Sequence, residues 1–359
     1  MRRFPAIRLR WWHGAVAAVA LLACAAVVVT LVVVLGEPDE PEPGPPEDAP
    51  RALVGLGDST MSGDGAGSYV PGTDGEDGNW CRRSTRAAIH RTSLPGIDET
   101  INLACSGARA RHVQLGDEER YGEPSQTEQL AEIAETHRIV AVVVAVGAND
   151  DPGFTRLMTQ CIQAWFGGAP CSESFAPEWE DTIQAMVPKV VQALDDIRTV
   201  MADADYAEDD YQLVLQSYAS PLSPDIAEEV RNLGGCPFTE TDLEWVRTEG
   251  VEGLNAGLRE AAAEAEARFL DLSSAGQGRE ACTGGQDPST EWFTRLTVEW
   301  EALEDTDRAR QAARESFHPN AAGHAQVGSC LSQFLAGDAQ QAACLVGEDG
   351  NLRAAPALP

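Results

Sequence analysis

Short apolar segments alternate with longer amphipathic ones along most of this chain, and this alternation limits the possible folds more than any other feature. Segments rich in β-branched residues predict five strands, at 52–56, 100–104, 139–146, 211–216 and 268–272. Helical patterns lie between and after them, at 84–91, 126–137, 178–201, 241–267 and 320–335. This order is typical of one α/β/α domain with a mostly parallel sheet, in which the carboxyl ends of the strands meet along one edge.

The N-terminal region has the composition of a membrane segment. Residues 14–35 carry no charge, are long enough to cross a bilayer, and follow four arginines within the first ten residues. These features predict a cytoplasmic basic segment at 1–13 and a transmembrane anchor at 14–35, with the remainder extracytoplasmic. A cleaved signal peptide, which would leave a secreted protein, is the main alternative. Lipid modification of Cys24 is a minor one.

The rest of the chain is acidic. Residues 36–51 combine proline with acidic residues, which predicts an extended linker, followed by a domain at 52–345 and a tail at 346–359. The whole chain has 57 Asp and Glu against 26 Lys and Arg, and a net charge of −31. A body of this charge repels phosphate backbones, so the composition excludes nucleic acid as a partner.

The number of cysteines indicates the redox state of the compartment in which the protein folds. Cys24 lies in the apolar segment, and the other eight form an even set. These eight cysteines form no CxxC pair, and no histidine lies at zinc-finger spacing from them. The sequence therefore predicts neither a metal nor a cofactor. Four disulfides formed in an oxidising compartment explain them better. The eight are Cys81, Cys105, Cys161, Cys171, Cys236, Cys282, Cys330 and Cys344.

Four short motifs place a reactive or polar residue at a strand end or a helix start. They are GLGDS at 55–59, NLACSG at 102–107, VGAND at 146–150 and ESFHPN at 315–320. The first provides Ser59, and the last provides His318 just before a helix. Gly107 offers a backbone N–H, and Asn149 offers an amide. Taken singly, each motif is more often a tight turn than a catalytic feature.

The joint order of the four motifs resembles the SGNH (GDSL-type) hydrolase family, over residues 53 to about 334. The glycine-rich run at 57–67, followed by Tyr69 and CRRS at 81–84, is similar to the disulfide-containing actinobacterial branch of secreted esterases and lipases. The resemblance implies a flavodoxin-like three-layer sandwich and hydrolysis of carboxylic esters through an acyl-serine intermediate.

The resemblance also implies a role for each motif residue. Ser59 would be the nucleophile and His318 the general base. The oxyanion hole would consist of the N–H groups of Ser59 and Gly107 and the side chain of Asn149. The family usually has aspartate three residues before the histidine, whereas this chain has Glu315. Glu315 is therefore the expected third catalytic residue, and a backbone carbonyl is the alternative group to orient the imidazole.

Proximity along the chain and the resemblance together suggest a disulfide pairing: Cys81–Cys105, Cys161–Cys171, Cys236–Cys282 and Cys330–Cys344. The segment 161–171, which contains Trp165 and Phe166, is either an apolar flap over the acyl site or a stapled surface loop.

The expected function is that of an extracytoplasmic serine esterase or lipase acting on a small-molecule or lipid ester. A carbohydrate or cell-envelope O-acetyl esterase is the alternative within enzymes, and it would be most active on acetyl esters. A catalytically idle surface binding module with the same fold is the alternative of another class. Such a module would not react with a fluorophosphonate probe at Ser59.

Overall fold

The structure is a computed structural model that describes residues 45–46, 48–151, 153–297 and 315–356. All of these belong to the unit Gly44–Pro359, the second of two units into which the chain divides. The predicted segments 1–13 and 14–35, and most of the linker at 36–51, lie outside the described residues. Among the residues that the structure describes, no helix is long and apolar enough to cross a membrane.

Seven strands form one sheet in the order β2-β1-β3-β4-β5-β6-β7, and only the last pair is antiparallel. They are β1 (Arg51–Gly57), β2 (Glu99–Asn102), β3 (Arg138–Ala145), β4 (Gln212–Gln216), β5 (Arg268–Asp271), β6 (Gln341–Val346) and β7 (Leu352–Pro356). The mostly parallel α/β sheet predicted from the sequence is thus confirmed. The parallel strands bring their carboxyl ends to one edge, where the predicted site residues follow them.

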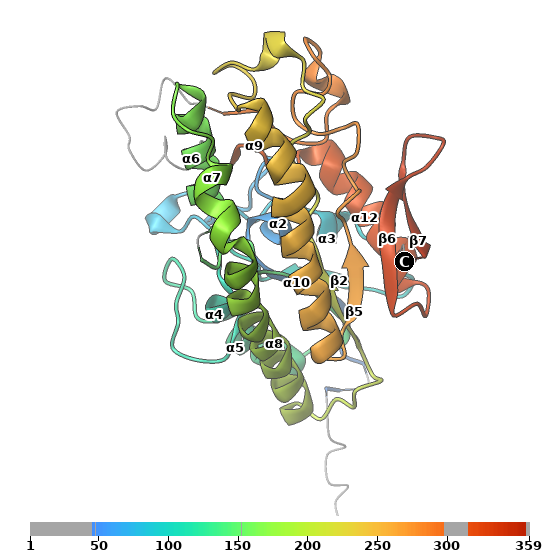
Figure 1. The fold of residues 1–359 in the computed structure, drawn as a ribbon. Helices are drawn as coiled ribbons and strands as arrows, with labels where there is room; N and C mark the ends of the chain where they lie inside the picture. Colours follow the sequence, from blue (N-terminus) through green and yellow to red (C-terminus); the bar gives the residue numbers. More distant parts are fainter. Residues whose placement is uncertain (1–44, 47, 152, 298–314, 357–359) are drawn as a thin grey trace, which may run out of the picture. The chain divides into compact units, whose positions relative to one another are not determined.

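The predicted number of five strands was wrong, because β6 and β7 add a hairpin at one edge of the sheet (Figure 1). The sheet therefore extends into the segment 346–359, which the sequence reading assigned to a tail. The sequence of β7, LRAAP, has little intrinsic strand propensity. Its pairing with β6 and the burial of Leu352, which is 1% exposed, are tertiary effects.

Helices cover both faces of the sheet. Apolar residues alternate along β1: Leu53 packs in the core that includes α3 and α12, whereas Val54 and Leu56 pack in the core that includes α5, α8 and α10. The result is a three-layer α/β/α sandwich. The longer helices are α5 (Gln126–Ala134), α6 (Phe154–Trp165), α8 (Trp179–Asp203), α10 (Val251–Glu264) and α12 (Ala321–Leu335). The shorter ones are α2 (Ser59–Ser62), α3 (Ala88–Arg91), α4 (Ala110–Val113), α7 (Ser172–Phe175) and α9 (Glu240–Trp245).

The helix expected at 84–91 is only the single turn Ala88–Arg91, and two helical regions nearer the site also differ from the prediction. The single helix expected at 241–267 consists of α9, a π-helical turn at Val246–Gly250, and α10. Helix α6 was not predicted as a helix, although its apolar residues Leu157, Met158, Cys161 and Ala164 recur at helical spacing and are buried. In Figure 1, α6 lies on the side of the domain toward which β5 points. Both regions border the candidate site.

Candidate active site

Ser59 is the first residue of α2, directly after β1. Gly57 has φ +137°, and a Cβ there would collide with the carbonyl oxygen of Ala145 in β3, so the turn requires glycine. The buried amide of Gln126 holds both backbone groups of Gly57, with distances of 2.6 and 2.8 Å. The carboxylate of Asp58 caps α2 by accepting a hydrogen bond from the N–H of Thr60 at 3.0 Å. These contacts hold the serine at the carboxyl edge of the sheet.

His318 reaches the same edge from the far end of the chain. Its Nε2 lies 2.7 Å from Oγ of Ser59, and both residues are 7% exposed. Phe317 has φ +64°, which is uncommon outside glycine, and its buried ring packs against Phe238. Asn320 then caps α12 through hydrogen bonds from the N–H groups of Ala322 and Gly323. The structure thus brings together the two residues that the sequence pointed to as nucleophile and base.

In the structure, the carboxylate of Glu315 contacts other side chains than the imidazole of His318. Its carboxylate forms an ion pair with Arg82 and accepts a hydrogen bond from the hydroxyl of Tyr69 at 2.9 Å. The backbone carbonyl of Ser316 lies 3.3 Å from Nδ1 of His318. This geometry corresponds to the alternative considered from the sequence, because the Glu315 carboxylate is already engaged by a nearly buried guanidinium.

Gly107 and Asn149 line the same polar groove as Ser59 and His318. Gly107 adopts φ +69°, a left-handed conformation that favours glycine. The side-chain amide of Asn149 donates to Oδ2 of Asp58 at 3.3 Å. All the residues predicted for the oxyanion hole therefore lie around one cavity.

Tyr218 is a site residue that the sequence reading missed. It follows β4, and its hydroxyl donates to Oδ2 of Asp58 at 2.6 Å, so it shares an acceptor with Asn149. Burial raises the pKa of Asp58 to about 7, although the hydrogen bond from Tyr218 acts in the opposite direction. Burial and the neighbouring Asp58 raise the pKa of Tyr218 as well. The position of Tyr218 at a strand's carboxyl end was the available signal.

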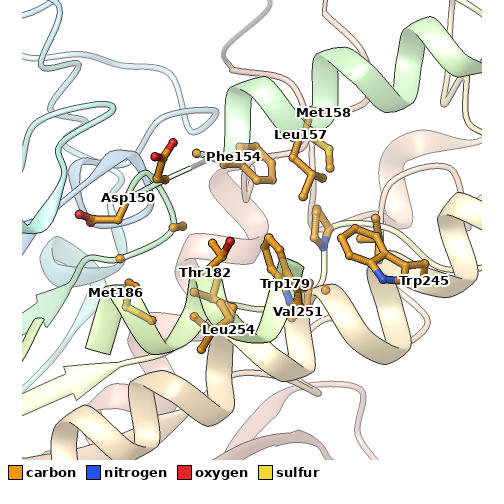
Figure 2. Close-up of a pocket in the computed structure, with 18 residues that line it drawn as sticks. Asp150, Phe154, Leu157, Met158, Trp179, Thr182, Met186, Trp245, Val251 and Leu254 are labelled. Atoms are coloured by element: carbon orange, nitrogen blue, oxygen red, sulfur yellow. The ribbon is translucent and has the colours of Figure 1, made fainter. Parts of the chain in front are cut away.

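An apolar pocket adjoins the site (Figure 2). It has about 600 Å³ of empty space, counting the open solvent at its mouth. Residues Leu157 and Met158 of α6 face Trp179 and Thr182 of α8 across it. Trp165 and Phe166, the aromatic residues of the expected flap, do not line this pocket, and Phe166 is 64% exposed.

The structure forms four disulfides with the suggested pairing: Cys81–Cys105, Cys161–Cys171, Cys236–Cys282 and Cys330–Cys344. Two of these disulfides involve cysteines that are near site residues in the sequence. Cys105 precedes Gly107 by two residues, and Cys161 joins α6 to the residue before α7.

The family model of the GDSL-like lipase/acylhydrolases matches residues 56–326, which include Ser59 and His318. The chain belongs to this family. It is accordingly a carboxylic-ester hydrolase.

Similar proteins include two from Streptomyces coelicolor. Lipase 2 is 26% identical over 283 residues, which is 77% of this chain and 87% of that protein. Lipase 1 is 27% identical over 277 residues, 77% and 83% of the two chains. The crystal structure of an extracellular lipase from Streptomyces rimosus superposes with a TM-score of 0.52 at 24% identity, over 77% of this chain and 95% of the other. That last likeness shows a shared fold.

Proposed function

We propose that this GDSL-family hydrolase is a serine esterase or lipase in which Ser59 is the nucleophile and His318 the general base. The observation that carries the proposal is the 2.7 Å separation between Nε2 of His318 and Oγ of Ser59. A hydroxyl at hydrogen-bond distance from an imidazole can lose its proton as it attacks an ester.

The reaction proceeds in two steps. Oγ of Ser59 bonds to the ester carbon while its proton passes to Nε2 of His318. The bond from that carbon to the alcohol oxygen then breaks, and His318 returns the proton to the departing alcohol. Water attacks the acyl-serine with His318 again as the base, which releases the carboxylic acid and restores Ser59.

Three hydrogen-bond donors and one backbone carbonyl support the transition state in this proposal. The N–H groups of Ser59 and Gly107 and the amide of Asn149 stabilise the oxyanion, and each such donor contributes about 3–4 kcal/mol. The carbonyl of Ser316, 3.3 Å from Nδ1 of His318, accepts a hydrogen bond from Nδ1–H, so that the unprotonated Nε2 faces Ser59 as the base.

We also propose that the domain acts outside the cytoplasm, held by the uncharged segment 14–35 as a transmembrane anchor. The four disulfides support an oxidising compartment. The arginines before residue 14 support a cytoplasmic N-terminus. Protease added to intact cells that produce the protein should digest the domain. Protection of the domain until the cells are lysed would contradict this location.

The experiment that tests the catalytic assignment is the Ser59→Ala substitution. The variant should lose hydrolysis of p-nitrophenyl butyrate and labelling by a fluorophosphonate probe. Ser93→Ala, an exposed serine ahead of β2, is the matched control and should behave as the wild type. Turnover by Ser59→Ala at the wild-type rate would refute the assignment.

The same measurements address the alternatives. An O-acetyl esterase would be most active on acetyl esters, whereas the apolar pocket beside Ser59 favours longer acyl chains. An idle binding module would leave Ser59 unlabelled. The contact of Ser59 with His318 supports the enzyme instead.

A further inference from the structure

Helix α6 has two chemically different faces. Its buried face carries Leu157 and Met158, which line the apolar pocket. The other face carries Thr155, Arg156 and Thr159, which line the polar groove beside Ser59. Since residues three or four apart share a helix face, this helix separates an apolar cavity from a polar one.

The apolar pocket lies next to a cavity at the nucleophile. This second cavity is lined by Ser59 and His318 and shares Phe154, Val251 and Leu254 with the apolar pocket. The ring of Phe154 also packs edge-on against the imidazole of His318, with 5.5 Å between the centroids. An acyl chain bound through its ester at Ser59 can therefore extend into the pocket between α6, α8 and α10.

Two acidic residues border the apolar pocket: Asp151 is exposed, and the carboxylate of Asp150 is held by other groups. Oδ2 of Asp150 accepts a hydrogen bond from the N–H of Ala110 at 2.9 Å, and Oδ1 lies 4.0 Å from Nζ of Lys189. The facing side chains of Figure 2 are mainly apolar or aromatic, so the pocket suits a hydrocarbon chain.

The polar groove on the other side of α6 is cationic. Arg109, Arg120 and Arg156 line it together with Ser59 and His318, and none of the described residues in its lining is Asp or Glu. This composition departs from that of the chain, in which acidic residues outnumber basic ones by 57 to 26. A net charge of −31 repels anions in general, so an anionic substrate needs a local cluster of positive charge at its site.

The three arginines differ in how they are held. The guanidinium of Arg120 donates to the carbonyl of Ser106, with a shortest distance of 2.7 Å, and so stands beside the predicted oxyanion residue Gly107. Arg109 is half-buried just before α4, and Arg156 is exposed in the first turn of α6. Guanidinium groups bind phosphate oxygens through paired hydrogen bonds, which suits them to a phosphate ester.

We infer that the substrates are amphiphilic phosphate-bearing esters. The acyl chain occupies the apolar pocket between α6, α8 and α10, and the phosphate on the alcohol side is held by Arg109 and Arg156. This inference rests on the proposed serine esterase function and specifies the substrate class of that same site. The bond that breaks is still the carboxylic ester at Ser59, so the alcohol leaves with its phosphate intact.

The test uses a pair of substrates that differ only in the phosphate: 1-octanoyl lysophosphatidic acid and 1-octanoyl glycerol. Both are used below the concentration at which they aggregate, so that no lipid surface contributes. The wild type should have the higher kcat/KM for the phosphate-bearing ester. Arg109→Gln and Arg156→Gln should each lower the ratio of the two kcat/KM values by about five- to tenfold. Arg111→Gln, an exposed arginine paired with Glu118, is the matched control and should leave the ratio unchanged.

The acyl pocket is tested by filling it. Leu157→Trp should shift the preferred p-nitrophenyl ester to a shorter chain, whereas Gln192→Trp on the exposed face of α8 should not. Thr182→Leu repeats this test by a smaller change in case the larger one prevents folding, which fluorophosphonate labelling reports. An unchanged chain-length profile in the labelled variants would overturn the acyl assignment.

Failure of this inference is distinguishable from failure of the proposed function. Hydrolysis of p-nitrophenyl esters that depends on Ser59, with an equal or lower kcat/KM for the phosphate-bearing ester, overturns the inference alone. An equal loss in the arginine variants on both lipid esters does the same. Hydrolysis that does not depend on Ser59 overturns the proposed function.

Discussion

The carboxylate of Glu315 is paired with the guanidinium of Arg82 and not with the imidazole of His318, three residues away. Arg82 is 5% exposed and also lies 3.1 Å from Asp64, with its guanidinium over the ring of Tyr69. This cluster joins the segment that carries His318 to the glycine-rich loop after Ser59. Glu315 therefore contributes to the position of the histidine loop, while the Ser316 carbonyl lies next to Nδ1 of His318.

We predict that Glu315→Gln lowers stability more than catalysis. Loss of the carboxylate leaves Arg82 with fewer partners and should cost about 1–3 kcal/mol of unfolding free energy. The kcat of the folded variant should fall by less than about tenfold, since a true triad carboxylate is worth about 10⁴-fold. Urea unfolding and p-nitrophenyl butyrate kinetics measure the two effects. A large loss of kcat with unchanged stability would mean that Glu315 acts as the third catalytic residue after all.

We predict that His318→Ala abolishes measurable turnover. Without the imidazole at 2.7 Å, no base is in place to accept the proton of Ser59. The kcat on p-nitrophenyl butyrate should fall by at least about 10³-fold. His137→Ala, at a partly exposed histidine paired with Glu99, is the control and should retain activity. Near-normal turnover by the His318 variant would mean that another group serves as the base.

We predict that Asn149→Ala and Tyr218→Phe lower kcat to different extents. Removal of an oxyanion donor usually costs about 10²–10³-fold, which is expected for Asn149→Ala. Tyr218 acts through Asp58, which accepts from both side chains, so Tyr218→Phe should have a smaller effect on kcat. Tyr211→Phe, a buried tyrosine that packs on Tyr206, is the control. Equal kcat in all three variants would argue against this hydrogen-bond chain.

We predict a pH-dependent stability difference between the wild type and Asp58→Asn. Burial raises the pKa of Asp58 from 3.8 to about 7, so between these values the folded protein holds a proton that the unfolded chain has released. The folded state then binds more protons, and the contribution of Asp58 to stability falls as the pH rises through this window.

The measurement is urea unfolding of both proteins from pH 4.5 to pH 8. The stability of the wild type relative to Asp58→Asn should decline with rising pH and level off above about pH 7. Taking the difference cancels other titrations, among them that of buried His324, whose pKa is lowered to about 4 by desolvation. A difference that grows with pH would contradict the raised pKa.

Local pattern was sufficient for the elements with strong periodicity and for the residues at strand ends. The continuous apolar run of β3 and the glycine-rich turns after β1 and β3 depend on burial and on backbone conformation. The order of the four motifs resembles that of the GDSL-type hydrolases, and this resemblance indicated Ser59, Gly107, Asn149 and His318 as one site. Tyr218 had the same kind of position but no distinctive motif around it.

By itself the sequence determined the alternation of strands and helices, the even set of cysteines and the types of the reacting residues, because these follow from composition and short-range spacing. Only the tertiary structure decided which groups meet. It paired β7 with β6, turned Glu315 toward Arg82, and placed the apolar pocket and the groove with three arginines on opposite sides of α6. Such contacts join residues far apart in the chain, and their partners are selected by packing and charge in three dimensions.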